Sequence, residues 1–201
     1  MKVTITLPAS LPEMAPDMVK ATQAAASRGL KQGVQIVVGA LREASCDGIL
    51  KRRTGQLAGS WKGGAVESAD YGFVAKIGSN MAYAGIQNDG GTIYPVKAKA
   101  LTIPFAENLT ARGVPRYESV AALKAHFGEK NVFSMKGKNI IWAKTGKSEK
   151  SLKPFFVLAK KSVIKPTHYI DKTLAAESDT VRERIGTEIA VAQIMAGRDG
   201  K

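Results

Sequence analysis

Residues 16–48 read PDMVKATQAAASRGLKQGVQIVVGALREASCDG, and this stretch decides the fold. Its larger apolar side chains recur every three or four residues among Ala, Gln, Lys and Arg, which is the spacing of one face of an amphipathic helix. These side chains are Val19, Leu30, Val34, Val37, Val38 and Leu41. We therefore predict one long helix that begins at about Pro16 and ends near residues 45–48.

Three glycines, Gly29, Gly33 and Gly39, lie inside this predicted helix. Each destabilises a helix by roughly 1 kcal/mol relative to alanine, so close backbone packing against a sheet or another helix is the natural compensation. We expect the helix to lie over a sheet.

The rest of the chain alternates between short strand patterns and turn residues, with three further helix patterns. Strands are predicted at residues 3–7, 65–68, 73–77, 100–105, 132–135, 140–143 and 154–164, short helices at 81–91 and 118–127, and a terminal helix at 180–195. Residues 136–139 would form the turn of a hairpin. The predicted fold class is α+β: a long N-terminal helix packed on a mostly antiparallel sheet, with an inserted hairpin region and a C-terminal helix. We expect one domain over residues 1–201, with 97–165 as a lysine-rich insert.

Composition excludes several classes of protein. The chain is 44% hydrophobic and 23% charged, which is typical of a globular protein with a real core. Its single cysteine, Cys46, excludes an internal disulfide and a cysteine-based zinc site. We expect no secretory signal at residues 1–8 and no membrane span, because no stretch approaches about 18 uncharged apolar residues. A cytoplasmic protein is expected.

The positive charge is concentrated in one region. Residues 124–172 hold 12 lysines against three acidic residues, whereas residues 1–123 hold 14 basic and nine acidic ones, and residues 173–201 hold four and five. A net charge of +13 favours acidic partners such as nucleic acid or an acidic protein surface. Lysine is a point charge that favours general electrostatic attraction over base readout, so a solvated face and a functional basic surface both remain open. The candidate basic surface is Lys136, Lys138, Lys144, Lys147, Lys150, Lys153, Lys160 and Lys161.

The residues of common catalytic sites are scarce, so we expect no enzyme, no metal and no cofactor. His126 and His168 share no signature with Cys46, and two histidines make a poor metal set. His168 is expected at a strand-to-helix junction, and His126 is expected to be packed or solvent-facing. Residues 146–148, Gly-Lys-Ser, resemble the end of a phosphate loop but do not run from a strand into a helix. A hydrolase is the least favoured of three functional hypotheses.

Four segments, in this order, resemble the virion-morphogenesis family of Mu-like phages, which comprises tail-completion or neck proteins. They are Arg53-Thr54-Gly55-Gln56-Leu57 before Ser60-Trp61, then residues 77–93 (IGSNMAYAGIQNDGGTI), Leu101-Thr102-Ile103-Pro104, and Lys165-Pro166-Thr167-His168-Tyr169-Ile170. The family shows a long N-terminal helix, an RTG-x-L element, a GGTI turn, an LxIP strand and a late motif before a C-terminal helix. The similarity covers residues 25–190.

The resemblance implies a structural virion protein of the head-to-tail junction, assembled in the host cytoplasm. It implies a homo-oligomeric ring, a hexamer, that connects tail and head around the DNA channel. The partners would be further copies of the chain, other junction and tail proteins, and DNA through non-specific contact, but no membrane. A ring follows when a heterologous contact closes by rotation. The alternative function is a non-sequence-specific nucleic-acid-binding protein that uses the lysine-rich surface of residues 124–172.

The candidate assembly residues lie in two glycine-containing segments, because exposed loops on a rigid scaffold carry contacts. They are Arg52, Arg53, Thr54, Leu57, Trp61, Tyr83, Asn88 and Thr92. For each of them a role in the core or in turn chemistry remains open. Trp61 and Trp142 are equally open between partner contacts and core anchors.

Overall fold

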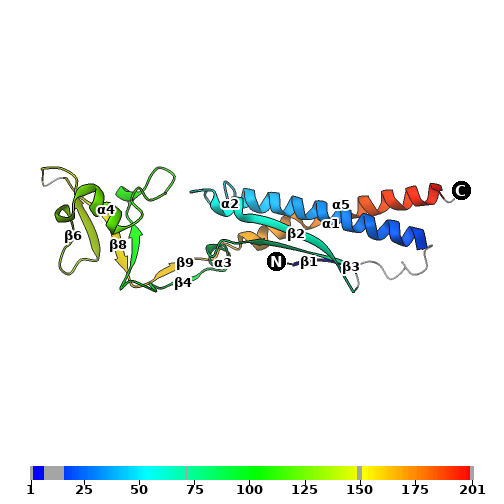
Figure 1. The fold of residues 1–201 in the computed structure, drawn as a ribbon, viewed down its shortest axis with the longest axis horizontal. Helices are drawn as coiled ribbons and strands as arrows, with labels where there is room; N and C mark the ends of the chain where they lie inside the picture. The colour runs from blue at the N-terminus through cyan, green and yellow to red at the C-terminus, as the bar shows by residue number, and fades with distance from the viewer. Residues whose placement is uncertain (1, 7–15, 71, 149–150, 200–201) are drawn as a thin grey trace. The chain divides into compact units, whose positions relative to one another are not determined.

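The structure, a computed structural model, describes residues 2–6, 16–70, 72–148 and 151–199 (Figure 1). The chain forms two compact units. Unit 1 comprises Met1–Asn88 with Thr167–Lys201, and unit 2 comprises Asp89–Pro166. Unit 2 is thus inserted into unit 1, and it begins eight residues before the lysine-rich insert expected from the sequence.

Two long helices dominate unit 1. Helix α1 spans Pro16–Ala44 and helix α5 spans Tyr169–Asp199, and the two lie side by side (Figure 1). A Cβ atom at Gly29 would lie 2.8 Å from Cα of Ile185, and one at Gly33 would lie 2.7 Å from Cγ1 of Val181. The predicted close packing is confirmed at these two glycines, and the packed neighbour is a helix. At Gly39 the prediction was wrong, because an added Cβ atom would meet nothing within 4 Å.

The sheet of unit 1 packs against the same helix α1. It contains β1 (Lys2–Thr6), β2 (Trp61–Ala69) and β3 (Gly72–Ser79), in the antiparallel order β1-β3-β2. Two short helices flank the β2–β3 hairpin: α2 (Gln56–Ser60) and α3 (Tyr83–Asp89). The predicted helix over a sheet is therefore confirmed, and the first strand agrees with the prediction except that residues 7 and 8 lie outside the described residues.

The core of unit 1 comes entirely from its own chain segments. Its buried members are Leu30, Val34, Val37, Val38, Leu41, Ala44, Leu57, Trp61, Ala75, Ile77, Ala84, Tyr169, Val181 and Ile185. Gly63 of β2 also serves this packing, because a side chain there would collide with Val34 of α1. The predicted apolar face of α1 is thus the face that packs against both the sheet and α5.

Unit 2 has a four-stranded antiparallel sheet of its own, in the order β5-β8-β7-β6. Its strands are β5 (Leu101–Pro104), β6 (Val132–Ser134), β7 (Ile140–Lys144) and β8 (Leu152–Ala159), and its helices are α4 (Val120–Phe127) and the 3-10 turns η2 (Ala106–Asn108) and η3 (Glu129–Asn131). A separate two-stranded ribbon pairs β4 (Gly91–Ile93) with β9 (Ser162–Ile164). The core beneath α4 consists of Leu123, Val132, Ile141, Ala143, Phe155 and Phe156.

Three predicted elements were wrong in extent, although the α+β class is confirmed. The strand expected at residues 65–68 is β2, which begins four residues earlier, at Trp61. The single strand expected at residues 154–164 is two strands, β8 and β9, which break at Lys160-Lys161 and belong to different sheets. The terminal helix begins at Tyr169, eleven residues before the predicted start at Thr180. No helix within the described residues is both long and apolar enough to cross a membrane.

Candidate functional site

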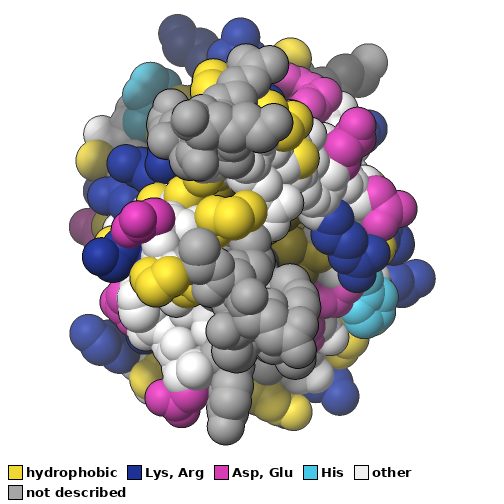
Figure 2. Space-filling view, turned by 90° about the vertical axis from the view of Figure 1, so that its right-hand side faces the viewer, with side chains coloured by type: hydrophobic (Ala, Val, Ile, Leu, Met, Phe, Trp, Pro, Cys, Tyr) yellow, Lys and Arg dark blue, Asp and Glu magenta, His cyan; other side chains and the backbone are white. Residues whose placement is uncertain are grey.

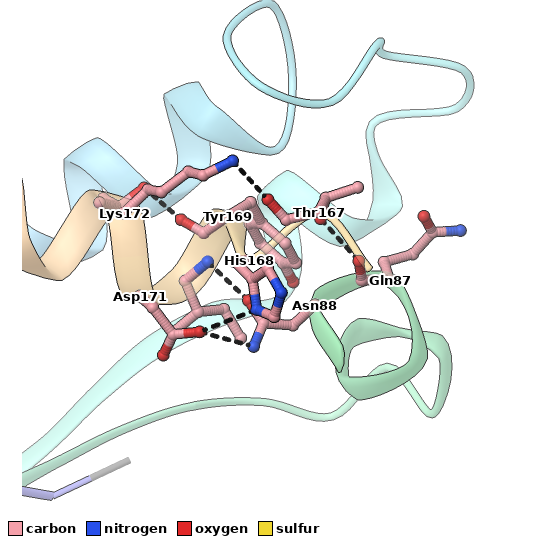
Figure 3. Close-up of polar contacts among 9 residues, drawn as sticks. Gln87, Asn88, Thr167, His168, Tyr169, Asp171 and Lys172 are labelled. Carbon is pink, nitrogen blue, oxygen red and sulfur yellow. Dashed lines mark hydrogen bonds and ion pairs between the residues drawn. The ribbon is translucent and has the colours of Figure 1, made fainter. Parts of the chain in front are cut away.

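Asn88, at the end of α3, organises the point where the chain leaves unit 1 and returns to it (Figure 3). Its side-chain Oδ1 accepts the backbone N–H of Ile170 at 2.9 Å, and its Nδ2 donates to Oδ2 of Asp171 at 3.2 Å. Its backbone carbonyl accepts the N–H groups of Thr167 at 3.1 Å and of His168 at 2.9 Å. One residue therefore bonds to four others at the start of α5.

These bonds satisfy backbone donors that the first turn of a helix leaves without intrahelical partners. The oxygen that accepts such an N–H usually belongs to the side chain of the residue just before the helix, whereas here it belongs to Asn88 of α3. The Thr167 hydroxyl donates to the carbonyl of Gln87 at 2.6 Å, which adds a further link (Figure 3). His168, at φ 52°, occupies the predicted strand-to-helix junction, and its Nδ1 lies 3.7 Å from Oδ2 of Asp171.

Tyr169 lies beneath this cluster and joins it to the core. Its ring meets that of Trp61 edge-on, with centroids 6.2 Å apart, and its hydroxyl donates to the carbonyl of Ala84 at 3.3 Å. The indole N–H of Trp61 donates to Oγ of Ser45 at 3.0 Å. Residues from three of the four segments that carry the phage resemblance thus meet in unit 1, while the fourth, Leu101–Pro104, forms β5 of unit 2.

Burial divides the eight candidate assembly residues into two groups. Leu57, Trp61 and Asn88 are buried in unit 1, with Trp61 only 3% exposed, so their side chains pack in the interior of this unit. The other five are exposed: Arg52, Arg53, Thr54, Tyr83 and Thr92. Thr92 lies in unit 2, so the exposed candidates do not all belong to one unit.

The lysine-rich surface belongs to unit 2, which carries 15 Lys and Arg against five Asp and Glu, while unit 1 carries 15 against 12. Lys150 lies outside the described residues, and the other seven candidates are all exposed. Lys153 forms an ion pair with Glu107 at 3.1 Å. Most of the candidate surface therefore consists of exposed lysines on one unit that form no ion pair with a described residue.

The residues considered for catalysis belong to different elements, and no contact among the three is found within the described residues. Cys46 follows α1, His168 precedes α5, and His126 is in unit 2 with its ring centroid 5.1 Å from that of Tyr117. Residues 146–148 lead into strand β8 and not into a helix, unlike a phosphate loop. Among the described residues, no group of three His, Cys, Asp or Glu side chains is placed to hold a metal ion.

Two features escaped the sequence analysis. Asp171 had no local motif, because its partner Asn88 lies 83 positions away. The second feature is a set of exposed apolar side chains on the sheet of unit 2, which includes Ile103 and Phe133. Period-two alternation in residues 101–103 and 140–144 was the signal that could have indicated it.

Comparisons of the chain with protein-family models, with curated proteins and with solved structures found no match.

Proposed function

We propose that this chain is a structural protein of the head-to-tail junction of a tailed bacteriophage, and that it assembles as a homo-oligomeric ring, a hexamer, which connects tail and head around the DNA channel. The observation that carries the proposal is the meeting of Trp61, Ala84, Asn88 and Tyr169 in unit 1. These residues come from three segments whose order resembles the phage family. Their convergence supports the view that the segments maintain one common scaffold.

The surface supports a role in assembly. Large apolar side chains are exposed on both units, among them Tyr83 of α3 and Val191, Ile194 and Met195 of α5. Figure 2 shows one face on which hydrophobic side chains lie among both basic and acidic ones. Apolar anchors within a polar rim are the usual anatomy of a protein–protein interface. The exposed loop residues Arg52, Arg53 and Thr54 would contribute polar contacts.

A second candidate function is binding of nucleic acid without sequence readout. The observation that favours it is the excess of ten positive charges on unit 2. Lysines that contact phosphates release counterions, so the affinity would fall steeply with added salt. In the junction protein, the same lysines would face either DNA in the channel or a neighbouring protein.

The deciding experiment is light scattering on the purified protein over a wide range of concentration, at low and physiological salt, with and without duplex DNA. A defined ring mass, with rings visible by electron microscopy, is expected. A small particle that gains mass only on DNA, and loses it with salt, would overturn the junction role and favour the second candidate.

Charge-reversed variants make the test specific. Arg53→Glu changes an exposed residue of the candidate contact loop, and Lys31→Glu makes the same change on an exposed position of α1. We expect Arg53→Glu to shift ring formation to higher concentration and Lys31→Glu to leave it unchanged. Equal effects of both variants would show that net charge, and not the loop, governs assembly.

A further inference from the structure

One face of the four-stranded sheet in unit 2 is apolar from edge to edge. In the strand register, Val157 of β8 lies directly opposite Ile103 of β5 on one side and Ile140 of β7 on the other. Directly opposed residues of neighbouring strands point to the same face of a sheet. Trp142 shares this face with Ile140 and lies opposite Phe133 of β6, so the face continues across all four strands.

Helix α4 packs on the opposite face. Its buried Leu123 belongs to the cluster that contains Ile141 and Phe156, which point away from Ile140 and Val157. The outer face carries Leu101, Ile103, Phe133, Ile140, Trp142, Pro154, Val157 and Ala159. Ile103 is 37% exposed and Phe133 is 40% exposed. A contiguous apolar patch of this kind marks an interaction site more often than a solvated surface.

Lysines border the apolar face at both ends of the strands. Ile140, Trp142 and Lys144 are each two residues apart in β7, so Lys144 lies on the same face at the end of the strand. Lys138 lies in the turn that leads into β7, and Lys160 and Lys161 follow β8 directly. All four are exposed, and none forms an ion pair with an acidic side chain within the described residues.

We infer that this sheet face docks another protein whose contact surface has an apolar centre and an acidic rim. The apolar centre argues against DNA, which would present phosphates to Ile103, Phe133 and Trp142. The lysine border argues against a second copy of the same face, because two such faces in contact would bring lysines against lysines. Complementary charge around an apolar core steers association and fixes its register.

The inference deepens the proposed function, and it rests on that function for the identity of the partner as a neighbouring protein of the junction. It assigns the sheet face of unit 2 to this protein and not to DNA in the channel. Docking through the sheet is measured separately from ring mass, so either conclusion can fail alone. A ring that forms without any peptide binding would leave the proposed function intact and remove this inference.

The test uses the full chain and three synthetic amphipathic peptides of equal length. The first has Leu and Phe on one face and Glu on the other, the second replaces Glu with Lys, and the third replaces the apolar residues with Ser. Methyl-labelled protein reports where each peptide binds through the signals of Ile103, Ile140 and Val157. We expect the first peptide alone to shift these signals, with an affinity that falls as salt rises.

Variants separate the apolar centre from the rim. Phe133→Ser and Lys144→Glu should each weaken binding of the first peptide by roughly tenfold. Val163→Ser is the matched control, because Val163 is 65% exposed and apolar but lies in β9, outside this sheet. Circular dichroism checks that every variant is folded, and Lys144→Glu keeps the test informative should Phe133→Ser fail to fold.

Three results would overturn the inference. One is equal binding of the first and third peptides. Another is that duplex DNA shifts the same methyl signals more than the first peptide does, which would assign the face to nucleic acid. The third is a concentration-dependent doubling of mass that Phe133→Ser abolishes, which would assign the face to a second copy.

Discussion

The side-chain oxygen of Asn88 accepts the backbone N–H of Ile170 at 2.9 Å, so the last turn of α3 caps a helix that begins 81 positions further along the chain. Because the capping residue is distant in sequence, the first turn of α5 depends on a tertiary contact for its cap. The start of α5 is bonded to α3, and the two chain segments that lead to unit 2 are held together at the same residue.

Replacement of Asn88 by alanine removes both the acceptor for Ile170 and the donor to Asp171. The backbone N–H of Ile170 loses its partner at a partly buried position, so we expect Asn88→Ala to lower the free energy of unfolding by about 1–2 kcal/mol. Gln87→Ala is the control, because Gln87 contributes its backbone carbonyl to the cluster while its side-chain amide points away (Figure 3). Urea denaturation measures both, and equal losses would contradict the cap.

Replacing glycines of α1 by alanine should change the stability of the protein in opposite directions at two positions of the same helix. Gly29→Ala places a Cβ atom 2.8 Å from a backbone atom of Ile185, and we expect a loss of about 1–3 kcal/mol. Gly39→Ala meets nothing within 4 Å, so helix propensity alone should raise stability by up to about 1 kcal/mol. Thermal and urea unfolding measure the pair. Stabilisation by both changes would show that α1 and α5 do not pack closely at Gly29.

Gly90 combines a left-handed backbone with a crowded site. At φ 72° an added Cβ atom would lie 2.8 Å from the nitrogen of Pro166 and 2.9 Å from the carbonyl oxygen of Ile164. We expect Gly90→Ala to lower the free energy of unfolding by about 2–4 kcal/mol. Gly137, at φ 78° with nothing within 4 Å, isolates the backbone contribution, and Gly137→Ala should cost only about 1 kcal/mol. Similar losses of stability for Gly90→Ala and Gly137→Ala in urea denaturation would show that the crowding around Gly90 contributes nothing.

Substitutions of Trp61 test whether this residue stabilises the core of unit 1 or serves a contact surface. Trp61→Ala should cost about 3–5 kcal/mol, because it opens a cavity beside Tyr169. Trp61→Phe retains a ring and loses chiefly the bond to Ser45, with an expected cost of about 1–2 kcal/mol. Urea denaturation gives both values. A Trp61→Ala protein of unchanged stability but impaired ring formation would return Trp61 to the assembly surface.

Unit 1 should fold without unit 2. The Thr167 N–H donates to the Asn88 carbonyl at 3.1 Å, so a short Gly-Ser linker can replace Asp89–Pro166 without separating the two ends. The core of unit 1 uses none of the removed residues. We expect native helix content by circular dichroism and a cooperative urea transition, measured beside the full chain. A transition without cooperativity would show that unit 1 depends on unit 2.

Local patterns predicted the elements whose causes are local. The apolar period of α1 set its bounds within a few residues, and the hairpin of β6 and β7 followed from its turn, where Gly137 adopts positive φ. The start of α5 could not be found in this way. Residues 169–179 carry no capping motif of their own, because their cap is Asn88, far away in sequence.

The remaining errors also concern partners that are distant in sequence. Residues 154–164 are nearly continuous in strand character, but β8 pairs with β5 and β7, whereas β9 pairs with β4. The choice of partner strand sets the break at Lys160-Lys161. Similarly, the sequence left Leu57 and Trp61 open between core and surface, since their burial depends on α1 and Tyr169.

The hydrogen bond from Thr167 to Asn88 also has a mechanical meaning. The two chain segments that enter and leave unit 2 are joined at one place, and Gly91 and Ile164 pair in the ribbon just beyond it. A force applied to either segment would therefore be carried by both α3 and the start of α5.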